Sequence, residues 1–173
     1  ESVYLRSVVD GFFGEQGVLL GKKWTLRRVA HDRGVPGDWH QDGSFMGRDI
    51  RSLNLWVALT HCGDDAPGLD VVAERFEDIV ETGTGGANLR WTVGPQTVDR
   101  IAPGRTVRPI FDAGDAIFFD HMNLHRTAAD PGMPNDRYAI ESWFLAPSTY
   151  GAMTVEGDPD DPTRPNDQMP LVF

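Results

Sequence analysis

Residues 53–61 read Leu-Asn-Leu-Trp-Val-Ala-Leu-Thr-His, and this stretch decides the class of fold. Its odd positions from 53 to 59 hold only leucine or valine, which share one face of an extended chain. The other face carries Asn54, Trp56 and Ala58. This two-residue period predicts a β-strand.

Strand-like runs continue on both sides of this segment, separated by Gly, Pro, Asn and Asp. The further candidates are residues 24–29, 38–42, 69–73, 105–111, 116–119, 125–129 and 137–145. The run at 116–119 is almost wholly apolar, so we expect it to be buried on both faces. Eight short strands joined by turns predict a mainly all-β chain, folded as a double-sheet jelly roll with few peripheral helices.

Helical patterns are weak. Residues 4–13 carry apolar side chains at a helical spacing, and residues 74–80 fit either a helical turn or an irregular continuation. We expect residues 83–88 to form a flexible loop. We predict one domain over residues 1–173, with its core at about 24–147 and an irregular, Asp- and Pro-rich tail at 156–173.

Composition excludes several classes of partner. The 173 residues include 26 acidic and 16 basic side chains, for a net charge of −10, which argues against nucleic acid and against an anionic membrane surface. No apolar run approaches the roughly 20 residues of a membrane span. The lone Cys62 excludes an internal disulfide framework and fits a reducing compartment, so we predict a cytoplasmic location. The chain opens on Glu1, which leaves a natural N-terminus further upstream open, and the sequence does not set the oligomeric state.

The strongest local motif is Trp-His-Gln-Asp-Gly at residues 39–43. On a strand, His40 and Asp42 would project from the same face. An imidazole beside a carboxylate makes two thirds of the facial triad that holds ferrous iron. The alternative is a surface hydrogen bond, because His-x-Asp is frequent by chance.

A third ligand has to come from another histidine. His125 begins a predicted strand, whereas His121, four residues earlier, would pair with it only on a helix, as in zinc sites. The flanking residues are strand-like, so we expect His121 to lie in a turn outside the metal site. His31 and His61 fit loop and strand-end positions, and Cys62 next to His61 would face the opposite side of the sheet.

Arg137 opens the last long strand, twelve residues after His125. An arginine that faces the inside of a barrel needs a carboxylate partner, and its planar fork suits a dianionic acid. Thr127, two residues past His125 on the same face, offers a hydroxyl to that carboxylate. The alternative is an exposed arginine at the start of a strand.

Taken in order, these motifs resemble the phytanoyl-CoA dioxygenase family. They are W-H-Q-D-G at 39–43, S-L-N-L-W-V-A-L at 52–59, A-P-G-L-D-V-V at 66–72, A-G-D-A-I-F-F-D at 113–120, L-H-R-T at 124–127 and R-Y-A-I-E-S-W-F at 137–144. The resemblance covers about residues 24–147. It implies a double-stranded β-helix that uses Fe(II), 2-oxoglutarate and O2, and that releases succinate and CO2.

The resemblance also implies site roles by position. His40, Asp42 and His125 match the iron ligands, and Arg137 with Thr127 matches the pair that binds the far carboxylate of 2-oxoglutarate. Trp56 matches an aromatic wall against the cosubstrate, and Asn54 is a second candidate of that kind. The acidic ligand Asp42 favours hydroxylation over halogenation, with a small organic molecule as substrate.

Two alternatives stay open at this point. A cupin-like metal enzyme that does not use 2-oxoglutarate would share the fold and the histidines but would not need Arg137 beside Thr127. A jelly roll that only binds a ligand is the other. For a CoA thioester substrate, Arg48 and Arg51 could face the phosphates, although both also fit a solvated loop.

Overall fold

The computed structural model describes residues 2–21 and 24–150, so the tail predicted at 156–173 lies outside the described residues. Within them the chain forms eight strands, most of which coincide with predicted runs. The strands are β1 Val18–Leu19, β2 Thr25–Val29, β3 Ser52–Ala58, β4 Gly68–Arg75, β5 Thr106–Val107, β6 Ala116–Asp120, β7 Asn123–Ala128 and β8 Arg137–Leu145.

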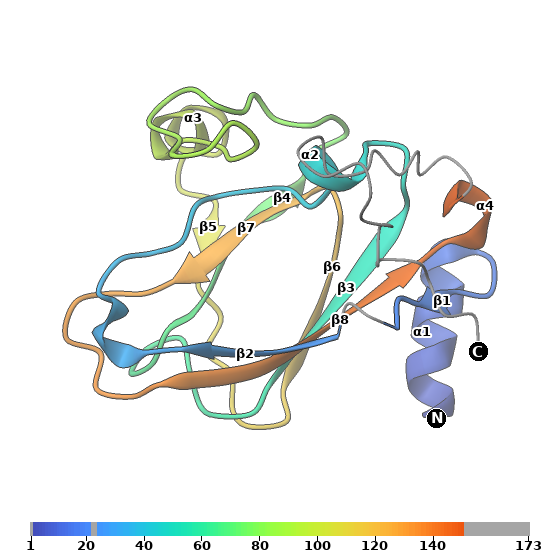
Figure 1. The fold of residues 1–173 in the computed structure, drawn as a ribbon, viewed down its shortest axis with the longest axis horizontal. Helices are drawn as coiled ribbons and strands as arrows, with labels where there is room; N and C mark the ends of the chain where they lie inside the picture. Colours follow the sequence, from blue (N-terminus) through green and yellow to red (C-terminus); the bar gives the residue numbers. More distant parts are fainter. Residues whose placement is uncertain (1, 22–23, 151–173) are drawn as a thin grey trace, which may run out of the picture.

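The strands form two antiparallel sheets that face each other (Figure 1). In the larger sheet β3 lies between β6 and β8, and the other edge of β8 pairs first with β1 and then with β2. The smaller sheet has the order β5-β4-β7. The predicted class, mainly β with a jelly-roll arrangement and few helices, is confirmed.

The core between the sheets is built from the even-numbered face of β3. Trp56 and Ala58 are buried there together with Phe119 of β6 and Leu69 of β4. Leu53, on the opposite face, is buried by a helix instead. Residues 53–59 therefore present apolar side chains on both faces of the strand. One face lines the interior of the roll, and the other is covered by a helix.

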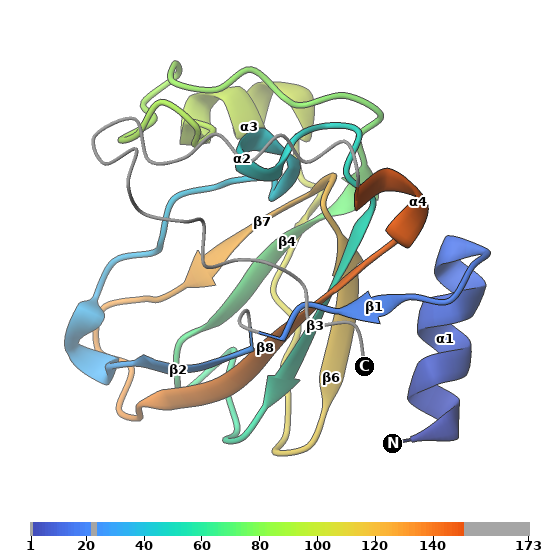
Figure 2. The same ribbon diagram turned by 45° about the vertical axis from the view of Figure 1, so that its right-hand side comes forward.

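That cover is α1, Val3–Phe13, which lies beside the larger sheet (Figure 2). Its buried side chains Val9 and Phe13 pack on Leu53 and Ala146. The helix begins where Ser2 accepts a hydrogen bond from the Leu5 N–H. The helix expected at residues 4–13 is thus present.

Four shorter helical segments complete the described chain: η1 His31–Arg33, α2 Gly43–Met46, α3 Pro95–Ile101 and α4 Pro147–Tyr150. Helix α3 was not expected from the sequence, and its Val98 packs with Trp39 and Val72 over the smaller sheet. No helix of the part of the chain described here is long and apolar enough to cross a membrane.

Three strand expectations were wrong in detail. Residues 38–42 do not form a strand, because only Trp39 and His40 make ladder pairs before the chain turns into α2. The run at 105–111 shrinks to β5. The run at 116–119 is not buried on both faces, because Ala116 is exposed and Ile117 is half-buried at the open end of β6.

Two further details differ from expectation. The two residues of β1 were not predicted as a strand. Residues 74 and 75 continue β4 and do not form a helical turn. Both elements depend on pairing with segments that are distant in the sequence. Strand β1 pairs with β8, and the end of β4 pairs with β7. The local periodicity of a sequence carries no information on such partners.

Candidate active site

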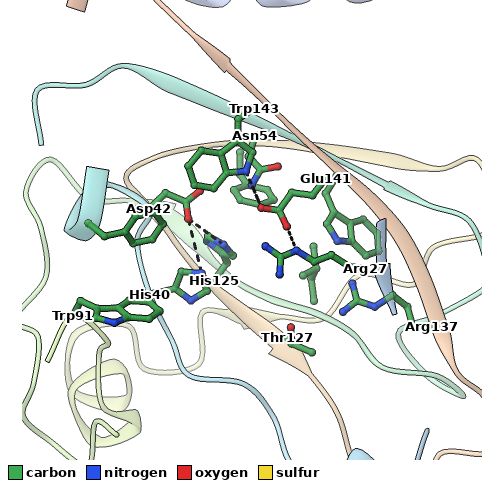
Figure 3. A pocket seen from close by; sticks show the side chains of 14 residues that line it. Arg27, His40, Asp42, Asn54, Trp91, His125, Thr127, Arg137, Glu141 and Trp143 are labelled. Carbon is green, nitrogen blue, oxygen red and sulfur yellow. Dashed lines mark hydrogen bonds and ion pairs between the residues drawn. The ribbon is translucent and has the colours of Figure 1, made fainter. Parts of the chain in front are cut away.

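Three side chains from distant parts of the sequence converge at the end of the roll (Figure 3). His40 and Asp42 precede α2, with Asp42 as its N-terminal capping residue, and His125 lies on β7. The Oδ1 atom of Asp42 is 3.9 Å from His40 Nε2 and 4.0 Å from His125 Nε2. These separations are too long for direct hydrogen bonds, so the three donors surround a gap between them.

Backbone pairing sets the two imidazoles side by side. The N–H of His40 donates to the carbonyl of His125, and the N–H of His125 donates back, each at 3.0 Å. The ring centroids are 4.4 Å apart. The sequence predicts that these two histidines belong to one site, and the antiparallel bridge is the physical reason that they meet.

Asp42 reaches the gap by a turn and not along a strand face, which corrects the sequence argument. Its φ of −60° and ψ of −31° are helical, as befits the residue before α2. The next residue, Gly43, approaches a neighbouring loop so closely that a Cβ there would lie 2.9 Å from Ile79 Cδ1 and 3.1 Å from the His121 carbonyl oxygen. Glycine at position 43 therefore permits the turn.

Gln41 fixes this turn from the other side and was missed by the sequence analysis. Its side chain is fully buried. Its Nε2 donates to the carbonyl of Met122 at 2.8 Å, and its Oε1 accepts from the Val80 N–H at 2.7 Å. Gln41 thus points away from the site and ties the turn to the β4–α3 connection.

Both histidines have the same ring orientation. Nδ1 of His40 donates to the Asp38 carbonyl at 2.9 Å, and Nδ1 of His125 donates to the Asn123 carbonyl at 3.1 Å. Those bonds fix the tautomer that leaves each Nε2 with a free lone pair toward Asp42. A neutral imidazole held in this way is a ready metal ligand.

Burial governs the protonation of the cluster. It lowers the pKa of His40 to about 4, assisted by His125, and it lowers the pKa of His125 as well. It also raises the pKa of Asp42 to about 7. The Asp42 side chain is almost inaccessible, and its Oδ2 has no hydrogen-bond partner among residues 2–21 and 24–150.

This donor set fits a divalent iron. Two neutral nitrogens and one carboxylate are the ligands of a 2-His-1-carboxylate centre. A dication would offset the buried carboxylate, which otherwise stands as an uncompensated charge. The lack of a partner for Asp42 Oδ2 among the residues that the structure describes is the observation that favours such an ion over a purely structural cluster.

Arg137 lies at the opposite end of the same pocket, a cavity of about 290 Å³ (Figure 3). The residue is only 1% exposed, and its Nε lacks a hydrogen-bond partner within the described chain. Its guanidinium carbon is 5.3 Å from the centroid of the Trp56 ring. Burial lowers the pKa of Arg137 to about 10, so the side chain stays charged at neutral pH.

The three remaining candidates also line this cavity, in different settings. Thr127 follows His125 on β7, and Trp56 lies below Arg137 and packs on Phe111. The amide of Asn54 donates to Glu141 Oε1 at 3.2 Å. Asn54 is therefore engaged with a neighbouring acid, whereas Trp56 presents its ring to the pocket.

Glu141 and Arg27 are pocket residues that the sequence analysis missed. Glu141 accepts from the Trp143 indole N–H at 2.7 Å and forms an ion pair with Arg27 of β2. Hydrogen bonds from these donors lower the pKa of Glu141 against the opposing effect of its burial. The two-residue period of β8, which sets Glu141 on the face of Arg137, was the signal that could have found it.

The other candidates of the sequence stay outside the cluster. His121 lies in a turn, as expected, and its ring faces the Ser52 N–H and the Arg48 carbonyl, at 3.4 and 3.1 Å. Cys62 is buried, and desolvation raises the pKa of its thiol to about 11, which makes a nucleophilic role untenable. His61 lies among exposed aspartates at the far end of β3.

An antiparallel jelly roll that carries two histidines and a carboxylate at one end of a pocket defines the class of cupin-like, double-stranded β-helix proteins. The chain belongs to the phytanoyl-CoA dioxygenase (PhyH) family, whose model matches residues 4–131. No curated protein sequence matches the chain significantly.

Solved structures share the fold at low identity. EvdO2 from Micromonospora carbonacea var. aurantiaca complexed with 2-oxoglutarate is 17% identical with a TM-score of 0.60, over 82% of this chain and 58% of that one. EctD from S. alaskensis with 2-oxoglutarate and 5-hydroxyectoine is 17% identical with a TM-score of 0.63, over 84% of this chain and 50% of that one. The epimerase SnoN in complex with Fe3+, alpha ketoglutarate and nogalamycin RO is 17% identical with a TM-score of 0.59, over 98% of this chain and 67% of that one. The chain thus spans about half to two thirds of their lengths.

Proposed function

We propose that the chain is an Fe(II)- and 2-oxoglutarate-dependent oxygenase that hydroxylates a small organic molecule and releases succinate and CO2. One observation carries the proposal. A single cavity holds a buried carboxylate beside two neutral histidines at one end and a buried arginine at the other, and each charged group has one atom without a partner in the described part of the chain. Family membership and the resemblance of the fold to structures with 2-oxoglutarate support it.

At the metal end, His40, Asp42 and His125 would hold the iron, which supplies the redox chemistry that activates O2. Asp42 contributes the charge that a dication needs. The carbonyls of Asp38 and Asn123 keep each Nε2 directed at the gap. Ligands that are oriented in advance do not have to be ordered when the ion binds.

At the other end, Arg137 would bind the far carboxylate of 2-oxoglutarate through its planar fork, and the Thr127 hydroxyl would donate to the same group. Trp56 would form the wall under this pair. Desolvation strengthens each of these contacts, because water competes poorly for a guanidinium that is only 1% exposed. Lysine would keep the charge and lose the two-pronged geometry.

Arg137 separates this proposal from the cupin-like alternative. A cupin-like enzyme without 2-oxoglutarate would not need a buried cation that lies 5.3 Å from the centre of an aromatic ring and whose Nε has no partner among residues 2–21 and 24–150. Leaving such a charge without a partner is strongly unfavourable. A dianionic cosubstrate provides the partner. A jelly roll that only binds a ligand is distinguished by the succinate assay below.

The test is succinate formation from 2-oxoglutarate by the purified chain in air. We expect succinate formation to require added Fe(II) and to be lost in Asp42→Ala. In Arg137→Lys it should need a far higher concentration of 2-oxoglutarate. Arg28→Ala, which removes a surface arginine paired with Asp136, serves as the control and should behave as the parent protein. Metal binding without succinate, or with unchanged succinate in Arg137→Lys, would contradict the proposal.

We infer further that residues 1–173 act as one domain in a reducing compartment such as the cytoplasm, on a small-molecule substrate. The buried, unpaired thiol of Cys62 supports the compartment. Fractionation of cells that produce the tagged protein tests it, and recovery of the protein outside the cytoplasm would contradict the inference.

A further inference from the structure

The metal end of the pocket is bordered by a group of aromatic rings that the proposed reaction does not use. Phe45 of α2 lies between Trp91 and Trp143, at centroid distances of 5.6 and 5.9 Å. Trp91 in turn meets the His40 ring edge-on at 5.7 Å. Figure 3 shows Trp91 beside His40, with Arg137 at the far end of the pocket.

These rings form a partly open wall. Phe45 and Trp91 are 48% and 40% exposed, whereas Trp143 is buried at 5%. Aromatic rings left open to solvent beside a cavity mark a surface on which a ligand with an apolar face gains contact area. We call Phe45, Trp91 and Trp143 the aromatic wall.

The charges in the pocket cancel. Its lining holds two cations, Arg27 and Arg137, and two anions, Asp42 and Glu141. Under the proposed function it also receives Fe(II) and the 2-oxoglutarate dianion, which cancel each other. A charged substrate would therefore enter without a counter-ion, and burying an unpaired charge is costly.

Arg48 and Arg51 do not line the pocket, and each already has a partner in the described chain. Arg48 pairs with Asp78 at 2.6 Å, and Arg51 donates to the Phe13 carbonyl at the end of α1 at 2.9 Å. Arg90, next to Trp91, is one exposed cation, whereas CoA carries several phosphate groups. The CoA role that the sequence left open for Arg48 and Arg51 thus loses support.

Resting on the proposed function, we propose that the primary substrate is an uncharged molecule with a flat apolar face, which lies against the aromatic wall, and that it is not a CoA thioester. The cavity of about 290 Å³ is at the lower limit of ligand pockets, which span roughly 300–1,000 Å³. With 2-oxoglutarate inside it, only the reacting end of a substrate fits. The flat part then extends over Phe45 and Trp91.

Calorimetry on the protein loaded with Fe(II) and 2-oxoglutarate without oxygen tests this. The probes are indole-3-acetamide, which is neutral, indole-3-acetate, tryptamine and phenylacetyl-CoA. We expect the neutral amide to bind at least about fivefold more tightly than each charged probe. Trp91→Ala should weaken the amide about five- to tenfold, the loss expected for one aromatic contact, and Trp91→Phe should recover part of it.

Trp24→Ala is the matched control, because Trp24 is 64% exposed and does not line the pocket. It should bind every probe as the parent protein does. Tighter or equal binding of a charged probe, no measurable binding of the amide, or an unchanged Trp91→Ala would overturn the inference. The absorption band of the Fe(II)·2-oxoglutarate complex is recorded first. Its absence refutes the proposed function itself, and its presence confines a failure to the substrate class.

Discussion

Two clusters in the described part of the chain bring histidine and carboxylate groups within 4.8 Å of each other. One is His40, Asp42 and His125, and the other is His61, Asp64 and Asp65. The donor atoms are of the same kinds. The first cluster has two histidines and lies inside the roll, whereas the second has one and lies in the exposed turn after β3, so the two differ above all in their surroundings.

In the exposed cluster both ring nitrogens of the histidine are already engaged. His61 Nδ1 bonds Asp112 at 2.7 Å and its Nε2 bonds Asp64 at 2.8 Å, and these bonds raise the pKa of His61. In the buried cluster the Nε2 atoms of His40 and His125 lie 3.9 and 4.0 Å from Asp42 and have no hydrogen bond within the described residues, and burial lowers the pKa of His40. Donor chemistry alone therefore does not define a metal site. Burial together with unused lone pairs does.

The largest expected effect comes from Asp42→Ala set against Asp64→Ala. We expect the first to reduce succinate formation by more than about 100-fold, because a direct ligand should matter more than the outer partners whose loss costs 10- to 100-fold. Asp64→Ala should keep parent activity. Steady-state assays with saturating Fe(II) measure both.

Thermal unfolding provides a readout that is independent of turnover. Fe(II) at about 100 times its Kd should stabilise the parent protein by about 2.7 kcal/mol, which raises Tm by about 5–10 °C. Asp64→Ala should show the same increase and Asp42→Ala should show none. An equal increase in both variants would mean that the metal binds at neither cluster, and an increase confined to Asp42→Ala would place it at the exposed one.

Arg137 extends the comparison to cations, and its loss is the second largest effect. Arg126 on β7 is also largely buried but pairs with Asp70 at 2.9 Å, whereas the Nε of Arg137 has no partner within the described residues. Arg137→Ala should weaken 2-oxoglutarate binding at least about 30-fold and leave iron affinity unchanged. Titration of the anaerobic iron complex with 2-oxoglutarate measures this. Unchanged binding would return Arg137 to a structural role.

Much of the fold is predictable from local pattern. Strand β8 has the predicted ends, Arg137 and Leu145, because its long, aromatic-rich run is not interrupted by a turn residue. By contrast, α3 was missed, since Gly94 and Pro95 at its start also fit a loop. Pro95 at the first helical position is a start signal that was not used, and the packing of Val98 with Trp39 stabilises the helix.

The candidate site follows the same division. Spacing and resemblance together predict the group of His40, Asp42, His125 and Arg137. They do not predict Gln41, whose role depends on Met122 and Val80 coming close in the fold. The aromatic wall was missed for the same reason, because α2, the β4–α3 connection and β8 each supply one ring.

Arg27 and Arg28 offer a smaller contrast between buried and exposed partners. Both lie on β2, but Arg27 pairs with Glu141 inside the pocket and Arg28 pairs with Asp136 at the surface. Arg27→Gln leaves Glu141 as an unpaired anion near the 2-oxoglutarate site. We expect 2-oxoglutarate binding to weaken about two- to fivefold, a modest loss because Arg27 is 52% exposed.

A double variant shows whether the charge of Glu141 is the cause. Arg27→Gln combined with Glu141→Gln should recover most of the lost affinity, while Arg28→Gln should lose none. Titrations of the three proteins with 2-oxoglutarate give the coupling directly. Equal losses in Arg27→Gln and Arg28→Gln would show that the effect is unrelated to the pocket.

The smallest expected effect concerns the exposed cluster. Protonation of this cluster should change the stability of the fold, whereas metal binding should do so at the buried cluster. The pKa of His61 is raised from its ordinary 6.5 by its bonds to Asp112 and Asp64. A raised pKa means that the folded state binds the proton more tightly than the unfolded chain does. The resulting stabilisation is complete below pH 6.5 and disappears as the pH rises through the pKa of His61 in the folded state.

His61→Gln should therefore lower Tm slightly at pH 6 and leave it unchanged at pH 9, without added metal. Asp64 stays ionised throughout this range because its pKa is lowered, so it does not contribute to the difference. An equal loss at both pH values would assign His61 a packing role in place of a charge.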